Sequence, residues 1–144
     1  MPVVTAVANA MTRPLPPVMS PRAHAVTDYL VIGSFLAAGF LFRRRNPRAS
    51  FGAFLCAGAG LATSLLTAYP GGVARVISFQ NHGKFDIGLA AMMATMPEFL
   101  AFSDRNEKKF FLREAGVVTA LTNLTDFRPR LVRSASRVAR RRFV

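Results

Sequence analysis

The sequence predicts an all-α protein: a four-transmembrane-helix bundle built from two tandem helical hairpins, followed by a C-terminal amphipathic helix. The first observation behind this prediction is the apolar patterning. The 144-residue chain is 51% apolar and only 18% charged. Residues 49–74 carry no ionisable side chain except Cys56 and Tyr69, and residues 23–42 carry Asp28 as their only formal charge. Runs of this kind approach the roughly 20 residues that cross a bilayer.

The second observation is an internal repeat, which becomes visible when the chain is shifted by 58 residues against itself. The shift aligns His24 with His82 and Asp28 with Asp86. The other matched positions are Ala57-Gly58 with Ala115-Gly116, Ala62 with Ala120, and Leu66-Thr67 with Leu124-Thr125. Each copy has the length of one helical hairpin. Two such hairpins would share one orientation in the membrane, related by an axis along its normal.

Charge excludes some classes of protein and favours others. Nineteen Lys and Arg stand against seven Asp and Glu, a net charge of +12. A chain that is half apolar is too hydrophobic for disorder, and its basic excess indicates an anionic partner, either nucleic acid or a membrane surface. The uncharged runs favour the membrane, so we expect the lipid bilayer as the partner and no nucleic acid. Cys56 is the only cysteine, which rules out an internal disulfide.

The helices follow from capping and breaking signals. Ser20 and Pro21 suit the cap and first position of the first helix, and the Pro-Gly-Gly run at 70–72 ends the second. Asn81 is the expected cap of the third. The expected spans are 23–42, 50–69, 82–102 and 110–127. Arg113 and Glu114 interrupt the fourth span, whose ends must therefore snorkel or pack against other helices.

The chain accordingly divides into three parts. Residues 1–20 form a flexible or interfacial N-terminal segment, residues 21–127 form the four-helix membrane domain, and residues 128–144 form a basic tail. Within the domain, repeat one covers 24–70 and repeat two covers 82–128. Small residues four apart let helices approach closely in lipid, which predicts that the second and fourth helices pack at the centre of the bundle. The small residues in question are Gly58, Ala62, Gly116 and Ala120.

The duplicated two-helix unit, with Pro97 near the far end of a helix, resembles the SPW-repeat type of small bacterial membrane protein. The signature of that family is Ser-Pro-Trp followed by an aromatic residue and glycine near a helix end. Here residues 96–102, Met-Pro-Glu-Phe-Leu-Ala-Phe, keep the proline and the aromatics but lack both Ser and Trp, and residues 39–42 of repeat one have no proline. The resemblance covers about 24–127. It implies a four-helix architecture in a bacterial cytoplasmic membrane and no particular activity.

Polar residues gather at one end of the predicted bundle. The two histidines, His24 and His82, are each followed four residues later by an aspartate, Asp28 or Asp86, and this spacing places each pair on one helix face. The hairpin topology brings the ends of the second and fourth helices to the same side. The other residues expected there are Thr67, Tyr69, Thr125, Asp126 and Arg75. Carboxylates near lipid are costly unless paired, so we expect these groups to pair.

Three interpretations of this cluster stay open. The His, Asp and hydroxyl groups can form a hydrogen-bonded clamp that fixes the register of the helices without a ligand. Alternatively, His24, Asp28, His82 and Asp86 can bind a divalent metal such as zinc, manganese or iron. In the third interpretation the same groups relay a proton, or hold a small ligand or a haem with the histidines as axial ligands.

The predicted function is that of a structural or accessory subunit of a membrane assembly, as a homo-oligomer or in a larger complex, with the polar cluster clamping one end of the bundle. No cofactor is predicted under this reading. The alternative is a metal- or haem-binding membrane protein with an ion, proton or redox role. Ser34, Ser64 and Ser78 lack the glycine-flanked setting of a hydrolase nucleophile. The pattern therefore favours a protein without catalytic residues.

The basic tail is typical of an interfacial amphipathic helix. The tail contains seven arginines and no acidic residue, and the arginines would bind anionic lipid headgroups. The arginines on the expected polar face are Arg130, Arg133, Arg137, Arg140 and Arg141. Together with the other basic residues near the two termini, they favour cytoplasmic N- and C-termini by the positive-inside rule.

Overall fold

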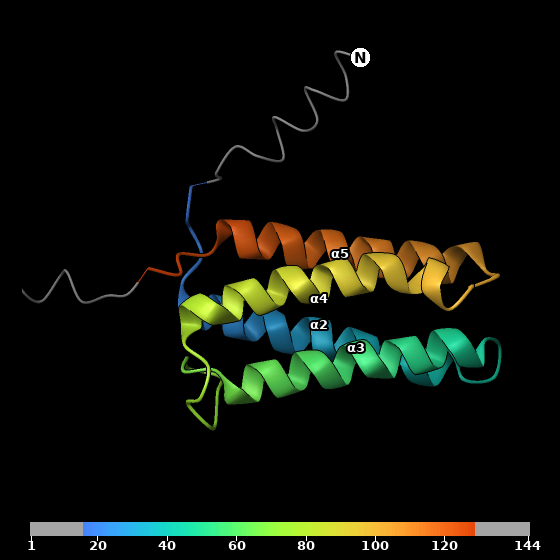
Figure 1. Ribbon diagram of the computed structural model, residues 1–144, viewed down its shortest axis with the longest axis horizontal. Helices are drawn as coiled ribbons and strands as arrows, with labels where there is room; N and C mark the ends of the chain where they lie inside the picture. The colour runs from blue at the N-terminus through green and yellow to red at the C-terminus, as the bar shows by residue number, and fades with distance from the viewer. Residues whose placement is uncertain (1–15, 129–144) are drawn as a thin grey trace, which may run out of the picture.

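The computed structural model describes residues 16–128 and contains four helices within that range (Figure 1). They are α2 (Pro21–Phe42), α3 (Pro47–Leu66), α4 (Phe79–Phe99) and α5 (Arg105–Leu124). Helix α2 packs against α3, and α4 packs against α5, so the chain forms two hairpins. The predicted all-α four-helix architecture of two hairpins is confirmed. The basic tail, with the arginines predicted to bind the membrane surface, lies outside the described residues.

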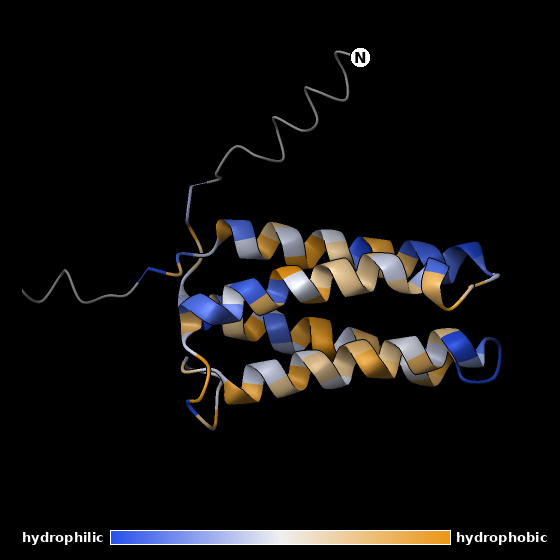
Figure 2. Cartoon of the chain, in the orientation of Figure 1, coloured by the Kyte–Doolittle hydropathy of each residue, from blue (hydrophilic) through white to orange (hydrophobic). Residues whose placement is uncertain are grey.

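The membrane prediction is supported only in part. In the described part of the chain, α2 and α3 are long and apolar enough to cross a membrane, whereas α4 and α5 are not. Figure 2 shows the reason: hydrophilic residues recur along α5 and at the start of α4, while α2 and α3 are mostly apolar between their ends. Length and composition therefore support two spans in the described part of the chain.

Helix α2 begins at Pro21 as predicted, whereas α3, α4 and α5 begin three to five residues earlier than predicted. The earlier starts arise because capping residues lie upstream of the apolar runs. The side chains of Ser20, Asn46, Ser78 and Asp104 accept hydrogen bonds from backbone amides in the first turns of α2, α3, α4 and α5. The Ser20 cap is confirmed. Asn81 is not the cap of its helix, because its backbone amide donates a hydrogen bond to Ser78 Oγ. The cap residues Ser20 and Ser78 are 58 apart, as are Asn46 and Asp104, so the repeat extends to capping.

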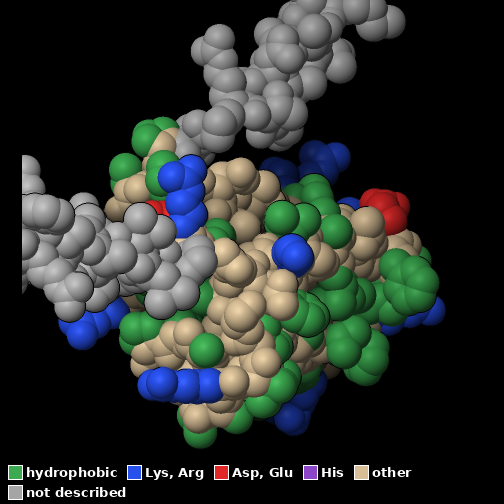
Figure 3. All heavy atoms as spheres, turned by 60° about the vertical axis from the view of Figure 1, so that its left-hand side comes forward, with side chains coloured by type: hydrophobic (Ala, Val, Ile, Leu, Met, Phe, Trp, Pro, Cys, Tyr) green, Lys and Arg blue, Asp and Glu red, His purple; other side chains and the backbone are tan. Residues whose placement is uncertain are grey.

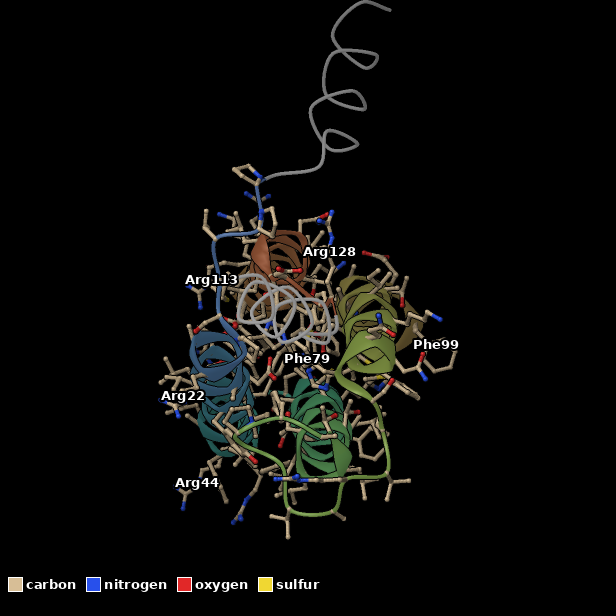
Figure 4. All side chains as sticks on the ribbon, turned by 90° about the vertical axis from the view of Figure 1, so that its left-hand side faces the viewer. Arg22, Arg44, Phe79, Phe99, Arg113 and Arg128 are labelled. Carbon is tan, nitrogen blue, oxygen red and sulfur yellow. The ribbon has the colours of Figure 1, made fainter. Side chains whose placement is uncertain are left out.

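The two hairpins meet mainly along α3 and α4. Seen end-on in Figure 4, the four helices surround a common axis, with α3 and α5 at opposite corners. The expectation that the second and fourth helices form the centre is therefore wrong. The core lies between all four helices, where Phe35 of α2 stacks edge-on against Phe110 and Phe111 of α5. The hairpins approach closely at Gly52, where an added Cβ would lie 3.0 Å from Met96.

The predicted small-residue face does not pack within the chain. Gly58, Ala62, Gly116 and Ala120 are exposed, and nothing lies within 4 Å of a Cβ built at Gly58 or Gly116. The buried stripe of α3 instead includes Ala53, Cys56 and Gly60. Gly58 is two residues from both Cys56 and Gly60, and two residues rotate a helix by about 200°. Gly58 therefore points away from the core.

Two short backbone pairings bring helix starts to helix ends. Met19, just before α2, pairs with Thr125, just after α5, and Thr67, just after α3, pairs with Ile77, just before α4. Met19 and Ile77 are 58 residues apart, as are Thr67 and Thr125, so the two pairings are equivalent in the repeat. They hold the first turns of α2 and α4 beside the last turns of α5 and α3. The predicted polar residues lie at this end of the bundle.

Candidate functional site

A buried cluster of His24, Asp28, His82 and Asp86 lies where α2 and α4 begin. One ligand-type atom from each of the four side chains lies within 4.8 Å of the others. Each histidine is 1% exposed and Asp86 is 4% exposed. The four groups come from equivalent positions of the two repeats, so the sequence-predicted meeting of the two His-Asp pairs is confirmed as a placement.

The four side chains form a closed ring of contacts. His24 Nε2 lies 3.1 Å from Asp86 Oδ2, and His82 Nε2 lies 3.1 Å from Asp28 Oδ2. The contacts within each helix are slightly longer, at 3.4 Å from His24 Nε2 to Asp28 Oδ1 and 3.3 Å from His82 Nε2 to Asp86 Oδ1. Each carboxylate thus touches both imidazoles. The shorter contacts cross between the hairpins, so the ring ties one repeat to the other.

Two threonines fix the histidine rings from behind. Thr125 Oγ1 lies 2.8 Å from His24 Nδ1 and 2.7 Å from the carbonyl oxygen of Leu121. Thr67 Oγ1 is placed in the same way, 2.8 Å from His82 Nδ1 and 2.7 Å from the carbonyl oxygen of Thr63. A hydroxyl has one proton and a carbonyl has none. Both contacts are satisfied when threonine donates to the carbonyl and histidine Nδ1–H donates to threonine, which leaves Nε2 to face the carboxylates.

Tyr69 adds a donor on one side of the ring. Its hydroxyl donates to Asp28 Oδ2 over 2.9 Å. Burial raises the pKa of Tyr69, and the nearby charge of Asp28 acts in the same direction, so the phenol stays protonated and acts as the donor. The equivalent residue of repeat two is Phe127, which has no hydroxyl. Asp86 therefore lacks the extra donor that Asp28 has.

Aromatic rings cover the cluster at the end of the bundle. The His24 ring meets Phe79 and Phe127 edge-on, with centroids 5.7 and 5.4 Å away, and the Tyr69 ring lies 5.0 Å from His82. Figure 4 looks onto this end and labels Phe79 among the four helices. Sequence reasoning missed Phe79 and Phe127. The repeat offered a signal for Phe127, because it is 58 residues after Tyr69.

Two residues predicted at this site are not part of it. Asp126 is exposed and accepts a hydrogen bond from the backbone amide of Arg128. It follows Thr125, whose backbone is extended, and successive side chains of an extended segment point in opposite directions. Arg75 is exposed in the segment between the hairpins. Thr67, Tyr69 and Thr125 do contact the cluster, as the topology predicted.

The geometry favours a small occupant of the cluster, or none, over a haem. A haem between the two imidazoles would need both carboxylates to move away, because each carboxylate contacts both Nε2 atoms. No family model, curated protein or solved structure matches this chain.

Proposed function

We propose that this chain is a small integral membrane protein that serves as a structural or accessory subunit, with all four helices embedded and the His/Asp cluster clamping the two hairpins at one end. The observation that carries the proposal is the pairing of four polar side chains at one end of the bundle, all of them buried except the part-buried Asp28. Their groups contact one another, and aromatic rings cover them. A cluster closed in this way favours a role in holding the bundle together over one in binding a substrate.

Helix length and surface composition support the membrane location. The helices have 20 to 22 residues, which corresponds to about 30 Å, the thickness of the hydrocarbon core. Large apolar side chains are exposed on every helix, among them Leu41, Phe51, Ile87 and Leu112. Figure 3 shows such side chains spread over the visible face, with Lys and Arg side chains scattered among them. Soluble monomers rarely expose apolar surface so widely.

The charges of α4 and α5 are compatible with embedding. On α5, Arg105, Lys108 and Lys109 lie in the first turns, close to the expected membrane surface. Arg113 lies over the ring of Phe110 and contacts Glu114, which is buried. Long basic side chains near a helix end can extend to the headgroups. Of the two acids of α4, Asp86 belongs to the cluster and Glu98 lies in the last turn.

Introduced tryptophans test whether α4 and α5 are embedded. The chain has no tryptophan, so Leu55→Trp on α3, Ile87→Trp on α4 and Val117→Trp on α5 each create a single reporter at an exposed position. The proposal predicts that bromine-labelled lipid acyl chains quench all three strongly and that aqueous iodide quenches them weakly.

Phe99→Trp is the matched control. Phe99 is exposed at the last residue of α4, so this reporter should lie near the headgroups and respond more to iodide. Iodide quenching of Ile87→Trp and Val117→Trp as strong as that of the control would contradict the four-span proposal.

A further inference from the structure

We propose that His24, Asp28, His82 and Asp86 bind one divalent transition-metal ion, with zinc the ion that suits this set of ligands. The ligands would be Nε2 of each histidine and a carboxylate oxygen of each aspartate. Thr67 and Thr125 act as positioning residues that hold the two rings. This inference goes beyond the clamp and does not depend on where the bundle resides, because it rests on the contacts within the cluster.

The hydrogen-bond donors and acceptors at the centre of the ring do not balance on their own. With Nδ1–H donated to threonine, a neutral imidazole presents only a lone pair at Nε2. Both Nε2 atoms face carboxylate oxygens at 3.1 to 3.4 Å, and two acceptors at that distance repel each other. The contacts of the ring are satisfied only when hydrogen atoms lie between the nitrogens and the oxygens, or when one divalent cation takes their place.

The spacing of the ligand atoms is compatible with a tetrahedral zinc site. A tetrahedral zinc site with bonds of about 2.0 to 2.1 Å separates its ligand atoms by about 3.3 Å. Two contacts between atoms of one such set, His24 Nε2 to Asp86 Oδ2 and His82 Nε2 to Asp28 Oδ2, are both 3.1 Å, close to that separation. One ligand atom from each of the four side chains lies within 4.8 Å of the others. Two imidazoles with two carboxylates is also a ligand set that suits zinc, manganese or iron. Two carboxylates neutralise a divalent charge, which lowers the cost of burying it.

The surroundings of the four ligands also resemble those of a structural metal site. Histidines that bind metals almost always donate their other ring N–H to an oxygen, which fixes the tautomer and the ring orientation. Thr67 and Thr125 provide that oxygen for His82 and His24. The aromatic cover formed by Phe79, Phe127 and Tyr69 leaves the four protein ligands as a closed set. Closed sets of this kind are typical of structural sites, so the ion would join the two hairpins.

Metal titration of the full chain tests the proposal. The purified protein is first treated with a chelator, and Co²⁺ and then Zn²⁺ are added. We expect one ion per chain, visible absorption bands from four-coordinate Co²⁺, loss of these bands when Zn²⁺ replaces it, and a higher unfolding midpoint in the presence of Zn²⁺. A folded chain that binds neither ion, and whose unfolding midpoint does not respond to Zn²⁺, would overturn the proposal and leave the metal-free clamp in place.

Variants separate ligand residues from their neighbours. Asp86→Asn and His82→Ala should each weaken Zn²⁺ binding at least tenfold. Asp126→Asn is the matched control, because this exposed acid lies at the same end of the bundle outside the ring, and it should bind as tightly as the wild type. Circular dichroism identifies any variant that has lost its helices. Equal Zn²⁺ affinity of a folded Asp86→Asn and the wild type would overturn the assignment.

Thr67→Val tests the positioning role through a different readout. Removing an outer partner of a ligating histidine typically weakens binding about 10- to 100-fold, while all four ligands remain. Thr119→Val is the control, because the Thr119 hydroxyl donates only to the Ala115 carbonyl of its own helix. We expect weaker Zn²⁺ binding and altered Co²⁺ bands for Thr67→Val alone. Identical affinities and spectra for the two variants would overturn the role of Thr67.

Discussion

At the scale of single residues, the two halves of the cluster are alike but not identical. Thr67 and Thr125 hold the histidines in the same way, whereas Tyr69 donates to Asp28 and Phe127 offers Asp86 no donor. The positions of His24, Asp28, His82 and Asp86 could be predicted because the repeat and the four-residue spacing both point to one helix face. The exclusion of Asp126 could not, because it depends on the direction of a single side chain after the helix has ended.

The Tyr69 hydroxyl gives a prediction at this scale. Tyr69→Phe should lower the free energy of unfolding by about 1.5 to 3 kcal/mol, because the part-buried carboxylate of Asp28 loses a hydrogen bond. Tyr29→Phe is the matched control. Its hydroxyl donates to the carbonyl oxygen of Gly71, a neutral acceptor, so the loss should be about 0.5 to 1.5 kcal/mol. Denaturant titrations of both variants measure the difference, and a larger loss for Tyr29→Phe would contradict the role given to Tyr69.

At the scale of helices, the number and type of elements could be predicted, but their first turns could not. Apolar periodicity finds the middle of a helix, whereas its start is set by the residue that caps the free amides. The polar run at 104–109 lies between the expected spans 82–102 and 110–127. In the structure, Asp104 caps α5, and Glu107 in its first turn is buried and accepts a hydrogen bond from Asn46. A polar residue in such a run can belong to a turn or to the first turn of a helix, and only its tertiary contacts decide between the two.

The cap of α4 gives a prediction at this scale. Ser78→Ala should cost about 1 kcal/mol of stability, because the backbone amide of Asn81 loses its hydrogen-bond acceptor. Asn81→Ala should cost little or be slightly stabilising, because alanine has the higher helix propensity and the exposed Asn81 side chain caps nothing. Unfolding midpoints of the two variants measure the contrast. The reverse order would restore Asn81 as the cap.

At the scale of the whole molecule, the repeat explains why contacts recur in pairs. The helix caps and the short backbone pairings appear twice with the same shift, and the single cluster is built from two equivalent His-Asp pairs. At the opposite end, Asn46 contacts Glu107, and Arg45 contacts Asp104, so the hairpins are joined at both ends. The sequence could predict the hairpins but not which helices face each other across them. That arrangement depends on Gly52 and the buried stripe of α3. Both faces of α3 are rich in Gly and Ala, so composition does not show which face is buried.

The central claim is that the two repeats are held together by contacts from the histidine of one to the aspartate of the other. A double-mutant cycle tests it most directly, with unfolding measured for His24→Ala, Asp86→Asn and the double variant in the presence of a chelator. Residues in one hydrogen-bonded network are coupled by about 0.5 to 3 kcal/mol. The account predicts coupling in this range for His24 with Asp86 and additivity for His24 with Asp126. Additive effects of the His24 and Asp86 variants would contradict it.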